Sequence, residues 1–273
     1  MNPEASVVRR GTGMPLVAIH GNGVDHRLLL PLDPCFDDGW ERLYLDLPGF
    51  GGAPALTGHG DLPDLARWLV DAVRGLVGTA PFALLANSLG GLLARHLVAQ
   101  LGEQVVGIAL IAPVVDPDPA RRTLPDRLVV ERDDALLASL PADDRAEFTG
   151  IAARQTAESW LAFRDHALPG IRSADPTAMS RLAARYVLDD VPEAVSPPFV
   201  RPALVVTGRQ DHVVGYRDQL GLLDHYAAAT YATLDRAGHN VHLEQPDVVS
   251  ALVREWSRRV RGAARGPGVA RQR

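Results

Sequence analysis

Residues 81–102 read PFALLANSLGGLLARHLVAQLG, and the main features of the predicted fold follow from them. It opens with an apolar run over 82–86, followed by small and polar residues centred on Ser88. The second apolar segment, 89–101, is long enough for about three helical turns, and Gly102 is a typical C-terminal stop. The pattern predicts a strand, a turn with almost no length and a helix. Ser88 must then reverse the chain by itself, in a sparsely populated backbone conformation.

Such a turn tolerates only small neighbours, and Ala86, Gly90 and Gly91 surround the serine. The Ser88 hydroxyl would stand clear of the sheet at a helix N-terminus, where the helix dipole and the Leu89 amide favour a developing negative charge. This is the nucleophile-elbow arrangement G-x-S-x-G, with Ala86 in place of the first glycine. A serine that only caps a helix gives the same local pattern, so the rest of the chain must decide.

The composition excludes several classes of protein. The chain has 273 residues, 47% of them apolar, which supports one large domain with a sizeable core. The formal net charge is −5, so no global basic field exists to attract nucleic acid. Cys35 is the only cysteine, which excludes an intrachain disulfide. Because neither a signal peptide nor an apolar run of about 18 residues is visible, we expect a cytoplasmic protein without a membrane span.

Strands and helices alternate along most of the chain. Continuous apolar runs predict strands at 16–19, 42–47, 82–86, 105–111, 203–207 and 230–234, with an edge strand at 6–10. Helical patterns cover 62–77, 89–101, 216–228 and 247–260. Strands of this kind are typical of a mostly parallel sheet with helices on both faces, an α/β fold.

Residues 116–198 interrupt this alternation. They contain helical patterns at 134–140, 143–166 and 177–188, broken by prolines and aspartates. We expect a helical cap here, inserted between two parts of an α/β core, residues 1–115 and 199–262. Its place in the chain puts it above the carboxyl ends of the strands, where open α/β sheets bind ligands. The Gly/Arg-rich residues 263–273 are predicted to be disordered.

A serine nucleophile needs a base, and the base needs a group that orients it. His239 follows the last predicted strand, and Asp211 follows the preceding one in the sequence GRQD. Ser88, Asp211 and His239 therefore each come just after the carboxyl end of a strand and are predicted to meet there. Asp116, which ends the strand before the cap, is the alternative acid.

The loop His20-Gly21-Asn22-Gly23 follows the first core strand at the same end of the sheet. We predict that the backbone amides of Asn22 and Leu89 form an oxyanion hole, and that His20 orients this loop through hydrogen bonds.

The cap aromatics Trp160 and Phe163 are candidates for a substrate pocket, with packing of the cap onto the core as the alternative. His239 and His242 are three residues apart but have no third ligand at a zinc-site spacing, so no metal is expected. His242 and Glu244 are expected to stabilise the loop and helix that follow His239.

Five segments in this order resemble the α/β-hydrolase superfamily, in its lid-bearing, esterase-like branch. The resemblance covers about residues 6–260, and its motifs are HGNG at 20–23, DLPGFGG at 46–52, ANSLGG at 86–91, GRQD at 208–211 and GHNVHLEQP at 238–246. It implies a central mostly parallel sheet, a cap between two late strands, a Ser–His–Asp triad and no cofactor.

The leading prediction is a serine hydrolase that cleaves a small carboxylester or lactone through an acyl-enzyme. The elbow also resembles that of carbon–carbon bond hydrolases of vinylogous diketones. Those enzymes commonly carry a tryptophan directly after the catalytic histidine. This chain has Asn240 at that position, so we prefer the esterase to the carbon–carbon bond hydrolase. The alternative from another class is a non-catalytic lidded module that binds a ligand, although no triad member is lost here. The sequence leaves the oligomeric state open.

Overall fold

The centre of the molecule is a seven-stranded sheet with the strand order β1-β3-β2-β4-β5-β8-β9. The structure is a computed structural model, which describes residues 3–264. The strands are β1 (Ser6–Arg10), β2 (Met14–Ile19), β3 (Trp40–Asp46), β4 (Phe82–Asn87), β5 (Val105–Ile111), β8 (Ala203–Gly208) and β9 (Ala229–Leu234). β1 pairs with β3 in antiparallel fashion, and all other pairings in this sheet are parallel. The predicted α/β fold is confirmed.

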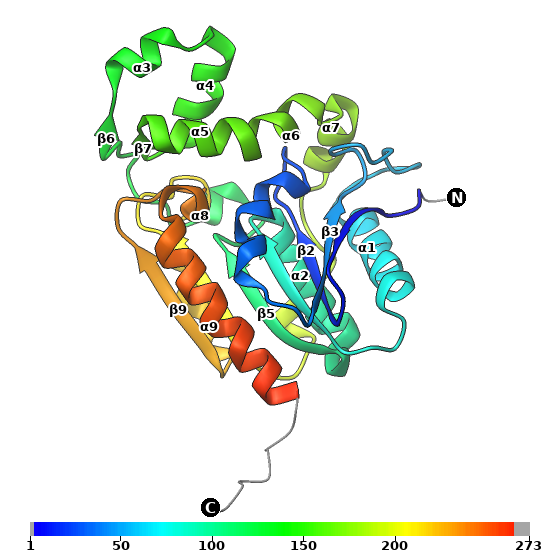
Figure 1. Cartoon of the computed structure of the whole chain (residues 1–273). Coiled ribbons are helices and arrows are strands. Elements are labelled where there is room, and N and C mark those ends of the chain that lie inside the picture. The colour runs from blue at the N-terminus through cyan, green and yellow to red at the C-terminus, as the bar shows by residue number, and fades with distance from the viewer. Residues whose placement is uncertain (1–2, 265–273) are drawn as a thin grey trace, which may run out of the picture.

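Helices cover both faces of the sheet (Figure 1). Helices α1 (Leu62–Val77) and α2 (Leu89–Leu101) share one apolar cluster with alternate strand residues. Helix α9 (Pro246–Ala264) and the 3₁₀ helix His26–Cys35 form a second cluster with the other strand residues. All six residues of β4 are buried, and the apolar side chains from Phe82 to Ala86 enter the two clusters in turn.

The chain between β5 and β8, which we call the helical segment (residues 112–202), places its α-helices over one end of the sheet (Figure 1). It contains α3 (Asp134–Ser139), α4 (Ala142–Ile151), α5 (Ala157–His166), α6 (Leu168–Ser173), α7 (Pro176–Ala184) and a small sheet of β6 (Glu131–Arg132) and β7 (Arg154–Gln155). This end is formed by the carboxyl ends of the strands. A side chain at Gly49, after β3, would meet Ala178, and one at Gly238, after β9, would meet Ala153.

The remaining elements are short. They are α8 (Val241–Glu244) and the 3₁₀ helices Gly102–Gln104, Pro119–Arg121, Pro192–Ala194 and Asp218–Asp224. No helix within residues 3–264 combines the length and the apolar character that crossing a membrane requires.

Three predicted helices differ from the structure. The helix expected at 143–166 is split into α4 and α5, because residues 154–155 pair as β7 and the Ala153 amide donates to Glu244 Oε1 (2.9 Å). The helix expected at 216–228 is a shorter 3₁₀ helix, since Tyr226 pairs with Phe199 as an isolated bridge. The third, expected at 177–188, ends earlier, as α7.

At the C-terminus, residues 263–264 belong to α9, so they are not part of a disordered tail. The rest of the predicted tail, 265–273, lies outside the described residues.

Candidate active site

Ser88 lies between β4 and α2 in the strained turn that the sequence predicted, with φ 53° and ψ −117°. Neighbouring backbone groups hold it there. The Ser88 amide donates to Ile111 O (3.1 Å), and Ser88 O accepts from the amides of Gly91 (2.9 Å) and Val114 (3.0 Å). These bonds stabilise a conformation that a non-glycine residue rarely adopts.

The glycines around the serine are required by close backbone approach. A side chain at Gly90 would collide with the carbonyl oxygens of Ile19 and His20 at the end of β2. One at Gly21 would lie 3.1 Å from Ser88 Cβ. The loop after β2 therefore packs directly against the elbow, which brings its backbone amides to the serine.

His239 and Asp211 meet at the ends of β9 and β8, and His239 Nδ1 lies 2.9 Å from Asp211 Oδ2. Asp211 is fully buried, and its other oxygen, Oδ1, accepts from the amides of Val213 (2.8 Å) and Val214 (3.0 Å). The carboxylate is thus fixed with one oxygen facing the imidazole. This contact favours the tautomer with a proton on Nδ1, which leaves Nε2 free to accept one.

The alternative acid, Asp116, lies elsewhere. Its carboxylate pairs with Arg121 (2.9 Å) and accepts from the Asp118 amide (2.9 Å). The structure therefore brings Asp211 to His239 and places Asp116 in a separate, partly exposed ion pair.

The predicted oxyanion groups have free donors. Neither the Asn22 amide nor the Leu89 amide has a hydrogen-bond acceptor among residues 3–264. His20 supports the loop as predicted, because its Nε2 accepts from the Leu47 amide (3.0 Å) and its Nδ1 donates to Gly21 O (2.7 Å). Burial lowers the pKa of His20, which favours this neutral form.

One side chain that ties the loops together, Gln210, was not given this role by the sequence. Gln210 Oε1 accepts from the Ala237 amide (3.0 Å), and its Nε2 donates to Asp235 Oδ1 (2.9 Å), so Gln210 links the loops of Asp211 and His239. The only sequence signal was the position of Gln210 inside GRQD.

Glu244 stabilises the loop of His239 as expected, by accepting from the Gly238 amide. It also accepts from the Ala153 amide of the helical segment (2.9 Å). One buried carboxylate therefore connects that segment to the backbone next to His239.

Two cavities adjoin Ser88, with volumes of about 410 and 450 Å³. Their shared lining residues are Asn22, Ser88, Ile151, Val213 and His239. We call the smaller one the apolar cavity and the larger one the arginine cavity. The apolar cavity is lined further by Val24, Leu28, Phe163, Ala167 and Ile171 among others, and the arginine cavity by Val114, Pro117, Pro119, Arg122 and Tyr186 among others.

The two predicted pocket aromatics therefore have different places. Phe163 lines the apolar cavity, whereas Trp160 is not part of either wall. Trp160 instead packs against Phe148 at a ring-centroid distance of 5.4 Å, inside the apolar cluster of the helical segment. Of the two roles that the sequence left open for Trp160, the structure therefore favours packing over lining a pocket.

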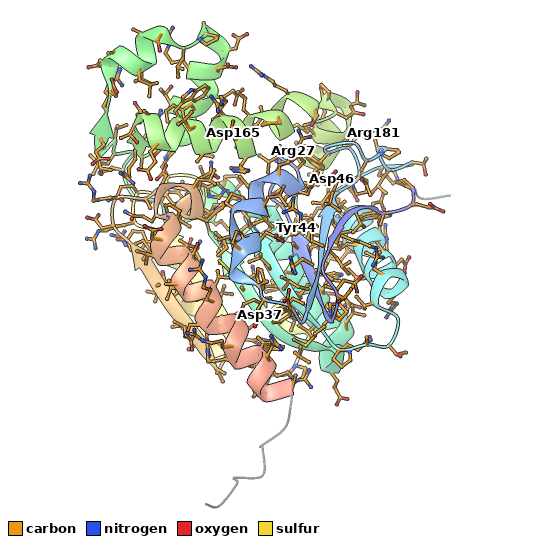
Figure 2. All side chains as sticks on the ribbon, viewed as in Figure 1. Arg27, Asp37, Tyr44, Asp46, Asp165 and Arg181 are labelled. Carbon is orange, nitrogen blue, oxygen red and sulfur yellow. The ribbon has the colours of Figure 1, made fainter. Side chains whose placement is uncertain are left out.

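One group of potential metal ligands exists among the described residues: Asp25, His26 and Asp46. Figure 2 places Asp46 and the neighbouring Arg27 at the end of the sheet that faces α5 and α6. Each of these groups has a partner in the protein, because His26 Nδ1 lies 2.8 Å from Asp46 Oδ1 and Arg27 pairs with Asp25 (2.8 Å). We interpret the cluster as support for the loop after β2.

Two buried groups close to His239 have shifted pKa values, and the two shifts change the pH dependence of stability in opposite directions. Burial lowers the pKa of His242, whose Nε2 donates to Leu28 O, to about 4. Burial raises the pKa of Glu244 to about 7. Between pH 4.5 and 6.5, the unfolded chain binds a proton at His242 that the folded state lacks, so this group lowers stability as the pH falls. At Glu244 the folded state keeps the proton, so this group raises stability as the pH falls.

We therefore expect His242→Gln and Glu244→Gln to tilt the pH dependence of unfolding in opposite directions. His242→Gln should lose less stability on acidification than the wild type, and Glu244→Gln should lose more. Each slope should differ from that of the wild type by up to about 1.4 kcal/mol per pH unit. Urea unfolding at several pH values between about 4.5 and 6.5 measures these slopes. Three parallel slopes would contradict the prediction.

The sheet order, the strained serine between β4 and α2 and the helical segment between β5 and β8 define the α/β-hydrolase class of fold. A sequence model described as the alpha/beta hydrolase family matches residues 16–252. The chain belongs to this family and is an enzyme of it.

Individual relatives agree with this assignment. The chain is 32% identical over 233 residues to the lipase LipV of Mycobacterium tuberculosis, which covers 79% of this chain and 86% of the lipase. It is 26% identical to the pimeloyl-[acyl-carrier protein] methyl ester esterase of Shewanella woodyi, over 94% of this chain and 98% of that one. An alpha/beta superfamily hydrolase from Oenococcus oeni PSU-1 superposes with a TM-score of 0.87 at 25% identity, covering 94% of this chain and 97% of that one.

Proposed function

We propose that the protein is a serine hydrolase that cleaves carboxylesters of small molecules, with Ser88 as nucleophile, His239 as base and Asp211 as the acid that orients it. The observation that carries this proposal is the contact of His239 Nδ1 with Asp211 Oδ2 (2.9 Å), on the wall of the cavities that Ser88 also lines. Relatives named lipase and methyl ester esterase support ester bonds as the substrate class.

In the proposed mechanism, Ser88 Oγ attacks the carbonyl carbon while His239 Nε2 takes the hydroxyl proton. The amides of Asn22 and Leu89 donate to the oxyanion of the tetrahedral intermediate. The imidazolium then gives its proton to the alcohol oxygen, the carbon–oxygen bond breaks and the acyl group stays on Ser88. Water attacks the acyl-enzyme, His239 takes its proton, and return of that proton to Ser88 Oγ releases the acid.

We further propose that residues 116–198 act as a cap over a core of residues 1–115 and 199–262. Support comes from the position of α3–α7 over the carboxyl ends of the strands and from the residues of α5 and α6 that line the apolar cavity. A cover of this kind keeps water away from the serine and gives the substrate an apolar wall. The carbon–carbon bond alternative gains no specific support, because Asn240 lines this cavity at the position after His239.

Labelling with a fluorophosphonate, followed by intact mass measurement, tests the nucleophile. We expect a single adduct on the wild type and none on Ser88→Ala, because only an activated serine reacts at a useful rate. Ser196→Ala is the matched control, since Ser196 Oγ also lies near a histidine, His225 (3.4 Å), and this variant should label like the wild type. An adduct on Ser88→Ala, or none on a folded wild type, would contradict the proposal; the latter would favour a non-catalytic ligand-binding module.

A further inference from the structure

The two cavities beside Ser88 differ in charge. The apolar cavity is lined by Leu28, Phe163 and Ile171 among others, and its one ionisable side chain apart from His239 is Glu147, which is exposed. The arginine cavity has Arg122 as its one charged side chain. A substrate that spans Ser88 therefore meets an apolar wall on one side and a guanidinium on the other.

The charge of Arg122 is not neutralised by the protein. Its three nitrogens donate to the carbonyl oxygens of Asp116 (2.8 Å), Val213 (3.0 Å) and Pro117 (3.0 Å), and no carboxylate pairs with it among residues 3–264. The carboxylate of Asp116, the residue whose carbonyl Arg122 Nε binds, is engaged by Arg121. A guanidinium has five N–H groups, so one on each terminal nitrogen is left for a ligand. These three bonds also fix the side chain, so little conformational freedom is lost when a ligand binds.

Tyr186 adds a second donor to the same cavity. Its side chain is partly buried, and burial raises the pKa of its phenol to about 12, although the charge of Arg122 acts against this shift. Both side chains line the arginine cavity. At neutral pH the phenol keeps its proton, so Tyr186 and Arg122 both offer hydrogen-bond donors. The catalytic mechanism above uses neither side chain.

We propose that the arginine cavity binds an anionic group, a carboxylate, of the substrate through Arg122 and Tyr186. The enzyme then prefers esters with a negative charge on one side of the scissile bond and an apolar group on the other. The proposal rests on the proposed ester hydrolysis and assigns a substrate class to that site. A carboxylate suits these donors, because a guanidinium binds it through charge-assisted and often paired hydrogen bonds.

Two pairs of esters test the preference and show which side carries the charge. Monomethyl adipate and methyl hexanoate differ by a carboxylate on the acyl side. The butyrate esters of 4-hydroxybenzoate and 4-methylphenol differ by a carboxylate on the alcohol side. We expect the wild type to have a kcat/KM at least about tenfold higher for the anionic member of one pair. No preference in either pair would overturn the proposal.

Substitution assigns the preference to Arg122. In Arg122→Gln, the ratio of kcat/KM for the anionic ester to that for its neutral partner should fall roughly 10- to 100-fold, mainly through KM. Arg122→Lys should restore part of this ratio. Arg164→Gln is the matched control, because it removes an equal charge from an exposed residue that lines neither cavity and should keep the wild-type ratio. If Arg122 only supported the loops at Asp116 and Val213, both esters would lose activity equally and the ratio would not change.

A binding measurement separates this inference from the proposed function. Calorimetry on Ser88→Ala with monomethyl adipate and 4-(butyryloxy)benzoate detects anion binding without turnover, and adding Arg122→Gln should weaken binding of the preferred ester by a similar factor. Hydrolysis of neutral esters without an Arg122-dependent preference would overturn the anion site and leave the serine hydrolase intact. Arg122-dependent binding by a protein that hydrolyses no ester would overturn the serine hydrolase and leave the anion site intact. No binding of either anion would overturn the inference.

Discussion

Asp211→Asn should lower kcat for ester hydrolysis by roughly 10³- to 10⁴-fold while the protein stays folded. The reason lies in the two amides that donate to Asp211 Oδ1. An asparagine would keep its oxygen at those amides and turn its NH₂ group toward His239 Nδ1. That ring nitrogen would have to accept, so the proton would move to Nε2, and His239 would lose its capacity to act as a base toward Ser88. Steady-state kinetics with a neutral ester measures the fall in kcat, and a urea unfolding curve checks that the protein stays folded.

Asp116→Asn is the matched control, because it makes the same chemical change at the alternative acid. The Asp116 side chain is partly exposed and pairs with Arg121, so we expect kcat within a few-fold of the wild type. The reverse result, with a large loss at Asp116 and a small one at Asp211, would show that the acid is assigned to the wrong residue.

The elements that the sequence predicted well are those set by local pattern. The elbow at Ser88 was predictable because a buried strand, small residues and a helix follow one another within 22 residues, 81–102. Asp211 and His239 were predictable because parallel strands end at one edge of a sheet, so residues after different strands meet there.

The features that the sequence did not predict depend on contacts between distant residues. The break between α4 and α5 is set by the bond of Ala153 to Glu244, which lies 91 residues away in the chain. Trp160 and Phe163 are equivalent in type and sit on the same helix, so only the packing of the helical segment decides that Phe163 faces the cavity. Arg122 gained its place in the site only when the fold brought it to Tyr186 and Val213.

An ion pair between buried Arg95 and partly buried Glu193 connects the stability of the fold to the elbow. Arg95 on α2 is 2% exposed, and its Nε and one terminal nitrogen each lie 2.7 Å from an oxygen of Glu193. Its other terminal nitrogen donates to Val114 O (2.7 Å), and the Val114 amide in turn donates to Ser88 O. Burial raises the pKa of Glu193, but the hydrogen bonds and charge of Arg95 outweigh it and hold the pKa below its ordinary value. Both partners are thus charged at neutral pH.

Glu193→Gln should therefore lower the free energy of unfolding by about 3–5 kcal/mol, because it leaves the Arg95 guanidinium buried without a counter-charge. A domain of this size should show a fall in Tm of roughly 10 °C. Glu41→Gln is the matched control: it breaks the exposed pair with Arg9 (2.8 Å) and should cost less than about 1 kcal/mol.

The double variant Arg95→Met, Glu193→Leu separates the cost of an unpaired charge from the worth of the pair. Well-packed apolar residues often replace a buried ion pair without loss, so the double variant should recover most of the stability that Glu193→Gln loses. It should not recover full esterase activity, because Val114 O loses the Arg95 donor that helps to fix the backbone holding Ser88 O. Recovery of both stability and activity, measured by urea unfolding and by kcat, would show that the ion pair serves stability alone. Loss of less than about 1 kcal/mol in Glu193→Gln would contradict the premise that the Arg95 charge depends on Glu193.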